Sequence, residues 1–242
     1  MEKIIYKKEI TIDARGVHFA ELNKKIKQVI NEYKDERVLI VLKNVLGQRY
    51  IGDGISGDIS ARIYGTPGND LGAFMDGPTI EVFGNGQDGI GNTMNSGTII
   101  VHGDCGDIAG YSMRGGSIYV RGNVGWRSGI HMKSYLDKFP VIVVGGRAGN
   151  FLGEYMAGGI IIVLGLNDNT IYIRENVKDY KLGKEVKSMD LDENDRMLLS
   201  MYINNFCDFF NLSYTLFTDR DFKNFIKLAP YSHRPYGKLY AY

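Results

Sequence analysis

Histidine and cysteine side chains are the first candidates for chemistry in this chain of 242 residues. Four histidines are scattered along the sequence: His18, His102, His131 and His233. No cysteine or carboxylate joins them at the spacing of a zinc-binding set. The two cysteines, Cys105 and Cys207, are too far apart in sequence to indicate a disulfide framework or a metal pair, which favours a reducing cytoplasm.

Other patterns that could carry chemistry lack the context that they need. Residues 84–89 (GNGQDG) have the spelling of a dinucleotide-binding turn, but such a site needs a following helix, and residues 90–97 are rich in turn formers. Glu81 has no acidic partner of the kind that a glycan hydrolase uses. Three arginines could bind an anion, although isolated surface arginines are usually solvated: Arg114, Arg127 and Arg147. The sequence therefore predicts no catalytic residue, cofactor site or metal site in this chain.

Glycines recur at fixed intervals and indicate the elements that position these residues. Short apolar segments end at Gly65, Gly84, Gly103, Gly122, Gly145 and Gly165. The first three steps are 19 residues long, and the next two are 23 and 20. Seven residues later comes a second glycine, at Gly72, Gly91, Gly110 and Gly129, and at Gly153 if the fifth repeat is counted from Gly146. Ten residues after the first glycine comes a methionine, at Met75, Met94, Met113 and Met132, and at Met156 when the count starts from Gly146.

One short strand every 19 residues leaves no return strand for a hairpin, so each repeat must stack in parallel on the one before it. Alternation within the strands places two apolar columns inside, and the methionines fill the remaining interior. The pattern predicts an all-β parallel β-helix of about seven coils. The glycines permit the turns, where one column is expected to be left-handed: Asn69, Asp88, Asp107 and Asn150. A four-residue insertion near residues 133–139 predicts a protruding loop.

The distribution of glycine divides the chain into three parts. Of 31 glycines, 28 lie between Gly47 and Gly165. Residues 1–46 are predicted to form an α/β cap with a helix over 17–34, residues 47–165 the β-helix, and residues 166–242 a tail. The tail is predicted to contain a helix capped at Asp192 and an extended segment over 228–237, and to pack on the β-helix.

Charge and hydropathy exclude some partners. The 29 basic residues balance 28 acidic ones, which argues against nucleic acid and membrane surfaces. No apolar run reaches the ~18 residues of a membrane span, and the N-terminus has no apolar signal segment. Cytoplasmic localisation is therefore expected.

The late strands place apolar residues in the columns expected to face outward: Ile142, Val144, Ile162 and Leu164. Such side chains need a cover, because a continuous apolar surface is unfavourable in water. Two interpretations stay open at this point. The tail helix covers these residues, or they form a docking face for a partner subunit.

Two segments of the repeat resemble a known family. Residues 65–74 (GTPGNDLGAF) and 149–159 (GNFLGEYMAGG) are similar to the glycine-repeat domain at the C-terminal end of the large glutamate synthase subunit. In that family the domain is a right-handed β-helix without the glutaminase cysteine, the flavin site or the iron–sulfur site. The same repeat occurs in the C subunit of formylmethanofuran dehydrogenase, so the repeat identifies a fold better than a function.

The resemblance implies a non-catalytic scaffold subunit of a glutamate-synthase-type oxidoreductase complex in nitrogen metabolism. The implied partners are a class II glutaminase subunit and a synthase subunit that holds FMN and iron–sulfur, braced so that ammonia passes between them. Two alternatives stay open: a scaffold in a complex of the formylmethanofuran dehydrogenase or N-methylglutamate synthase type, and an independent ligand-binding or enzymatic β-helix. Association of this chain with copies of itself is a further open possibility.

Overall fold

The computed structural model describes residues 6–34, 36–166, 186–213, 226–230 and 238–241. An N-terminal unit contains β1 (Lys8–Asp13), α1 (Phe19–Glu32) and β2 (Val38–Leu46). The strands of the coils follow: β3 (Ile59–Thr66), β4 (Asp76–Phe83), β5 (Ser96–Val101), β6 (Gly116–Val120), β7 (Pro140–Val144) and β8 (Ile160–Val163). The tail contains β9 (Val186–Met189), α3 (Glu193–Phe210), β10 (Ile226–Pro230) and β11 (Lys238–Ala241).

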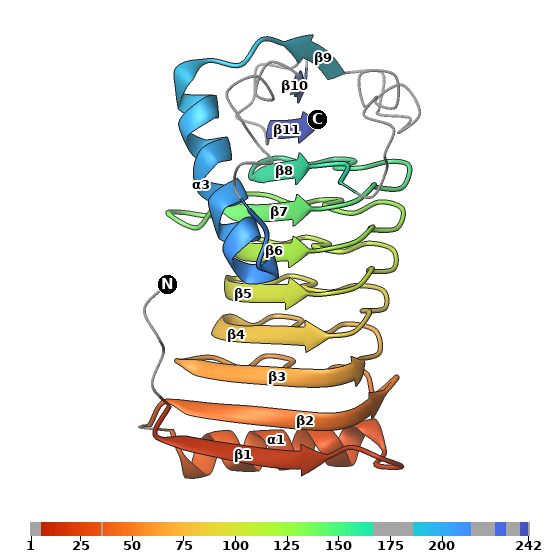
Figure 1. The fold of residues 1–242 in the computed structure, drawn as a ribbon, viewed down its shortest axis with the longest axis vertical. Helices are drawn as coiled ribbons and strands as arrows, with labels where there is room; N and C mark the ends of the chain where they lie inside the picture. Colours follow the sequence, from red (N-terminus) through yellow and green to blue (C-terminus); the bar gives the residue numbers. More distant parts are fainter. Residues whose placement is uncertain (1–5, 35, 167–185, 214–225, 231–237, 242) are drawn as a thin grey trace.

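Strands β1 to β8 form one parallel sheet in chain order, and the chain returns behind the sheet after each coil (Figure 1). The path from β2 to β8 is a right-handed parallel β-helix of about six turns, so the predicted fold class is confirmed with one turn fewer than expected. The tail extends the same sheet, because β11 pairs in parallel with β8, and β10 and β9 then add antiparallel strands.

The interior is built from stacked identical positions. One column runs through Ile40, Ala61, Ile80, Ile99, Ile118, Ile142 and Ile161. The predicted methionine column also lies inside. Met75, Met94, Met113 and Met132 are fully buried, and Met156 is partly buried against the same core. Close packing of these columns makes the β-helix a filled rod.

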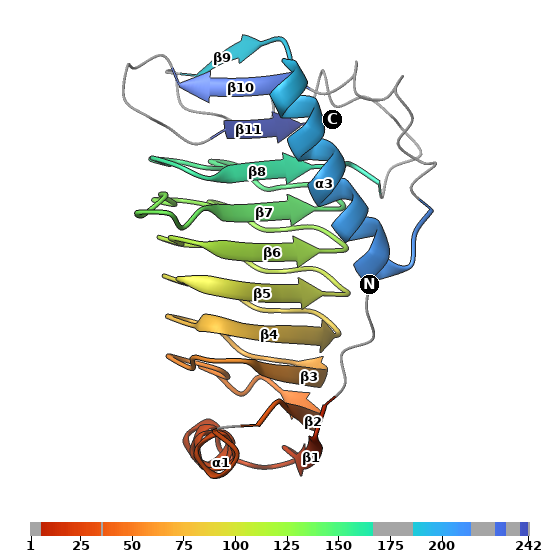
Figure 2. The same ribbon diagram turned by 90° about the vertical axis from the view of Figure 1, so that its left-hand side faces the viewer.

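The predicted α/β cap closes the N-terminal end of this rod. Helix α1 lies beside β1 and β2 and buries Leu22 and Ile26 against the core (Figure 2). The side-chain amide of Gln48 donates to the carbonyl oxygens of Ala14 at 2.9 Å and Val17 at 3.2 Å, which ties the first turn to the cap.

The tail agrees with the predicted helix capped at Asp192, whose carboxylate accepts from the N–H of Asp195 at 2.9 Å in a capping box. Part of the segment predicted to be extended forms β10, and residues 231–237 lie outside the described part of the chain. No helix in the described residues is both long and apolar enough to cross a bilayer.

Each turn places three alternate residues in the left-handed conformation. The sets begin at residues 50, 70, 89, 108, 127 and 151, and the members are two residues apart. The middle member is always glycine, as at Gly72 and Gly129. A Cβ at Gly129 would lie 2.5 Å from Cδ1 of Ile161, so a side chain at this position would require the buried Ile161 to shift. The outer members of the first five sets donate their N–H groups to the following coil, as Ser112 does to the carbonyl of Ile130 at 2.9 Å.

The column expected to be left-handed is different from the observed one. Asn69, Asp88, Asp107 and Asn150 precede the left-handed residues Asp70, Gly89, Ile108 and Phe151. The carboxylates of Asp88 and Asp107 instead accept from backbone N–H groups one turn later, at 2.9 Å from Asp107 and 2.7 Å from Trp126. These carboxylates therefore continue the hydrogen-bond ladder between coils.

Candidate docking surfaces

Helix α3 covers the outer face of the late strands (Figure 2). Leu199, Ile203 and Phe206 of the helix pack in one cluster with Ile162 and Leu164, which are buried. The amide of Asn205 also donates to the hydroxyl of Tyr119 at 3.3 Å. Burial raises the pKa of Tyr119 to about 12. The tail helix is thus the cover for this apolar surface, as one of the two interpretations expected.

The expectation that Ile142 and Val144 face outward is wrong. They pair with Ile118 and Val120 of β6 and belong to the interior core. The glycine that continues the column of Gly122 is Gly146, whose N–H donates to the carbonyl of Gly122 at 2.8 Å. Counting from Gly145 shifted the strand by one residue, and a shift of one residue exchanges the two faces of a strand.

The true outward column becomes apolar along the sheet. It runs through Arg62, Glu81, Ile100, Tyr119, Val143 and Ile162. Its polar beginning is open to solvent, and its apolar end lies beneath α3. The sequence contains this gradient, but it is visible only when the strands are aligned correctly.

The open part of the sheet face carries an aromatic stack. Tyr64 stacks on Phe83 with ring centroids 4.8 Å apart, and Phe83 stacks on His102 at 4.6 Å. Beside the stack, Nε2 of His102 lies 3.0 Å from Oε1 of Glu81, and Nε of Arg62 lies 3.5 Å from Oε2 of Glu81. This arrangement is a half-exposed polar and aromatic surface next to the end of α3, where Phe210 contacts His102.

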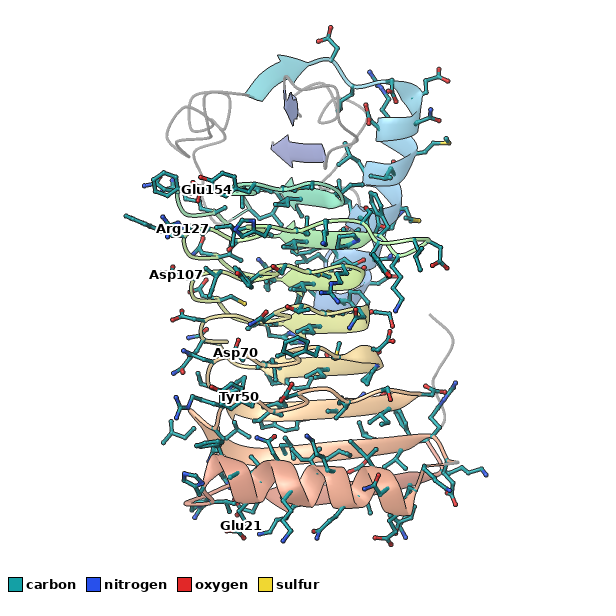
Figure 3. All side chains as sticks on the ribbon, turned by 180° about the vertical axis from the view of Figure 1, so that it is seen from behind. Glu21, Tyr50, Asp70, Asp107, Arg127 and Glu154 are labelled. Atoms are coloured by element: carbon teal, nitrogen blue, oxygen red, sulfur yellow. The ribbon has the colours of Figure 1, made fainter. Side chains whose placement is uncertain are left out.

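A second surface, the turn edge, consists of residues 49–57, 68–76, 87–95, 106–114, 125–133 and 149–157, one above another (Figure 3). Its N-terminal half comprises the first three segments, which carry four acids and one base: Asp53, Asp70, Asp76, Asp88 and Arg49. Its C-terminal half comprises the last three, which carry three bases and two acids: Arg114, Arg127, Lys133, Asp107 and Glu154.

The C-terminal half also carries a band of aromatic rings. His131 stacks on Tyr155 with ring centroids 5.2 Å apart, and Tyr111 meets His131 edge-on at 6.0 Å. The ring centroids of Trp126 and Phe151 are 6.2 Å apart. Trp126 is 54% exposed and Tyr155 is 71% exposed. Aromatic rings with this much exposed surface, beside arginines, are typical of protein interfaces.

The loop predicted near residues 133–139 protrudes beside this edge. The step from Asn123 to Arg147 is 24 residues, so the insertion is five residues rather than four. Its exposed large apolar residues are Tyr135, Leu136 and Phe139. Lys138 reaches back along the molecule, and its Nζ lies 3.1 Å from Oδ1 of Asp76.

Neither cysteine is a reactive nucleophile. Cys105 and Cys207 are buried free thiols, and burial raises the pKa of each. Within the described residues, no group of three or more His, Cys, Asp or Glu side chains is arranged to hold a metal ion. On the described surface, the sheet face and the turn edge are therefore the candidate surfaces for binding a partner.

Comparison with known proteins places the chain in a family. The family described as "GXGXG motif" matches residues 9–230. The uncharacterized protein MJ1350 of Methanocaldococcus jannaschii is 50% identical to this chain, and the alignment covers 96% of this chain and 97% of that protein. The chain belongs to the GXGXG family, which is that of the C-terminal domain of the large glutamate synthase subunit, and the resemblance seen in the repeat is confirmed.

Proposed function

We propose that this chain is a non-catalytic scaffold subunit of a glutamate-synthase-type complex in the cytoplasm. It braces a separate class II glutaminase subunit and a separate synthase subunit. The observation that carries the proposal is membership of the GXGXG family over residues 9–230, which include the cap, the β-helix and β10. The relative from Methanocaldococcus jannaschii is matched over 97% of its own length.

The architecture supports a bracing role. Stacked coils with a filled interior and a continuous hydrogen-bond ladder hold surface side chains at fixed heights along the rod. A partner that docks on one turn and a second that docks several turns away are thereby held at a fixed separation. In the proposed complex, this separation keeps the glutaminase and synthase sites aligned so that ammonia passes between them.

The proposed redox groups belong to the synthase partner. An iron–sulfur cluster is usually held by four cysteine thiolates, whereas this chain has two cysteines. Both are buried, and one lies in the β-helix and the other in α3. The chain therefore does not fit a cluster of its own, and FMN and iron–sulfur are assigned to the partner in this proposal.

Affinity purification of the tagged chain from its native cells, under gentle conditions and with mass spectrometry, tests this function. Recovery of a class II glutaminase together with an FMN and iron–sulfur synthase supports it. Recovery of the chain alone contradicts it. Recovery with a molybdenum or tungsten subunit, or with N-methylglutamate synthase subunits, assigns the scaffold to a different complex and overturns the glutamate synthase assignment.

Reconstitution gives the functional test. With the recovered partners, glutamine-dependent formation of glutamate is expected to require this chain. Glutamate formation from added ammonia is expected to continue without it, because free ammonia reaches the synthase site unaided. Equal glutamine-dependent rates with and without the chain would contradict a bracing role.

A further inference from the structure

We propose that the C-terminal half of the turn edge is a docking site for an acidic, extended segment of a partner protein. The site is centred on the aromatic–basic patch, defined as Tyr111, Arg114, Trp126, His131, Lys133 and Tyr155. This inference deepens the proposed scaffold function by naming the surface and the chemistry of the partner that it meets. It stands on three observations of the edge itself.

The first observation is the choice of residues at the left-handed positions. His131 has φ +56° and Tyr155 has φ +55°. Left-handed conformation costs a residue with a Cβ ~1 kcal/mol, and glycine avoids this cost. The same position in an earlier coil is Gly54, so the fold accepts glycine there. Large aromatic side chains kept at an unfavourable backbone position indicate a role outside folding.

The second observation is the exposure of these rings. More than half of the surface of Tyr155 and of Trp126 is exposed to solvent. By contrast, Tyr50, at a left-handed position in the N-terminal half, packs against Phe19 of α1 with ring centroids 5.8 Å apart. The aromatic–basic patch has no such cover among the described elements, which leaves its rings available to a partner.

The third observation is charge. Arg114 and Lys133 occupy the same position in successive coils and line a hollow of about 440 Å³ with Tyr111, His131 and Tyr155. In the part of the chain that the structure describes, neither forms an ion pair. By contrast, Nε of the nearby Arg127 lies 3.4 Å from Oε2 of Glu154. Two cations without counter-charges beside exposed aromatic rings complement carboxylates and apolar side chains on one partner.

The shape of the edge favours an extended segment. Successive coils of a parallel sheet are ~4.8 Å apart, so a strand-like peptide can meet one coil after another. Nucleic acid is a poorer match, because its phosphate backbone is neutralised by many lysines and arginines together, whereas the whole chain has a net charge of only +1. The charge and the rings together point to a protein segment rich in glutamate or aspartate with interspersed apolar residues.

Trp126 provides a direct measurement, because it is the single tryptophan of the chain. The probe is a synthetic peptide of alternating glutamate and phenylalanine residues, and the control peptide has lysine in place of glutamate. We expect the acidic peptide to shift Trp126 emission to the blue and to protect it from acrylamide quenching. We expect added salt to weaken this binding, because exposed charges are screened. No change on addition of the acidic peptide would overturn the inference.

Charge reversal localises the binding. Arg114→Glu and Lys133→Glu are each expected to weaken peptide binding about five-fold, the equivalent of one exposed ion pair. The matched control is Lys27→Glu on the exposed face of α1, which is expected to leave binding unchanged. Circular dichroism confirms folding of all three variants. Equal weakening by Lys27→Glu, or binding of oligothymidylate as tight as that of the acidic peptide, would refute a site for an acidic protein segment.

The same variants separate this inference from the scaffold function. If a double Arg114→Glu, Lys133→Glu variant recovers the glutaminase and synthase from cells as well as the unchanged chain does, the docking site is wrong and the scaffold function stands. If the unchanged chain recovers neither partner, the scaffold function fails. The Trp126 titration then still decides whether the aromatic–basic patch binds acidic segments.

Discussion

The N-terminal and C-terminal halves of the turn edge have the same backbone and carry different side chains. Both halves have three left-handed residues per turn, a central glycine and the same N–H ladder to the next coil. The N-terminal half is acidic, and its Asp70 is tied down by a hydrogen bond from Asn92 at 2.9 Å. The C-terminal half is basic and aromatic, with Trp126 and Tyr155 largely exposed.

Because the turns share one backbone, comparing their side chains separates what folding requires from what it does not. A feature that the fold requires must recur in every turn, as the central glycine does. A feature confined to some turns has another cause. Exposed aromatic rings are not wholly absent from the N-terminal half, where Phe74 is 54% exposed. Arg49 of the N-terminal half also lies over aromatic rings, those of Tyr50 and of Phe19 in α1, at 5.8 and 5.1 Å. In the described part of the chain, the hollow lined by two cations without ion pairs and by His131 and Tyr155 belongs to the C-terminal half. The difference between the halves therefore reports on binding, and their common features report on folding.

The largest expected effect concerns the interior, where the halves should not differ. Met75→Ala in the N-terminal half and Met113→Ala in the C-terminal half each remove a fully buried side chain. Each is expected to lower the free energy of unfolding by ~2–5 kcal/mol, because a cavity remains. Guanidinium denaturation measures this. A much larger loss in one half would show that the halves differ in packing as well as in surface.

The next effect concerns the central glycines. A Cβ at Gly91 would lie 2.6 Å from Cδ1 of Ile118, and one at Gly129 would lie 2.5 Å from Cδ1 of Ile161. Gly91→Ala and Gly129→Ala are each expected to cost ~2–4 kcal/mol, from left-handed strain and overpacking together. Gly54→Ala is the matched control, because nothing lies within 4 Å of its Cβ, and it should cost only ~1 kcal/mol. Equal losses in all three variants would show that backbone strain alone explains the central glycine.

Tyr155→Gly separates folding from binding. The change removes left-handed strain and loses one stacked ring, so stability should stay constant or rise by up to ~1 kcal/mol. Binding of the acidic peptide should nevertheless weaken. Thermal denaturation and Trp126 fluorescence measure the two quantities on the same sample. A marked loss of stability would mean that Tyr155 is held in place for the fold.

The smallest effect tests whether the halves are independent, because Lys138 of the inserted loop joins the C-terminal half to Asp76. Hydrogen bonds from Ser96 and Lys138 hold the pKa of Asp76 below its ordinary value of 3.8. A carboxylate with a lowered folded-state pKa stabilises the protein above that ordinary value, and the contribution is lost as the pH falls through the folded-state pKa.

Lys138→Ala is therefore expected to cost less than ~1 kcal/mol at neutral pH, since both side chains are partly exposed and solvent screens their attraction. The difference from the unchanged chain should disappear in acid, once the pH lies below the lowered folded-state pKa of Asp76. Guanidinium midpoints measured at neutral and acidic pH give both values. A difference that persists in acid would assign the role of Lys138 to packing.

The sequence was sufficient for the regular part of the molecule. Identical spacing forces identical positions to stack, so the parallel coils and the buried methionines followed from counting residues. The prediction from the sequence was wrong where the spacing can be counted from either of two adjacent glycines, Gly145 and Gly146. Gly153 and Met156 fit only a count from Gly146, and that signal was enough to place Ile142 and Val144 inside.

Other features depend on contacts that no local pattern encodes. The parallel pairing of β11 with β8 joins segments far apart in sequence. The left-handed conformation of Ile108 runs against the preference of a β-branched residue, and it lets the N–H of Ile108 donate to the carbonyl of Trp126 in the next coil at 2.8 Å. The uneven charge of the turn edge, by contrast, is visible in the sequence as soon as the turns are aligned.

The 19-residue step between coils has a consequence for the length of the molecule. Removing one whole step, such as residues 85–103, leaves every column in register and shortens the rod by one strand spacing, ~4.8 Å. Removing a single residue from within a strand would exchange the two faces of the residues beyond it, whereas a loop absorbs a change in length, as the insertion before β7 does. The length of the rod therefore changes only by whole coils. In evolution, the distance between two attached partners can be adjusted only in steps of one coil.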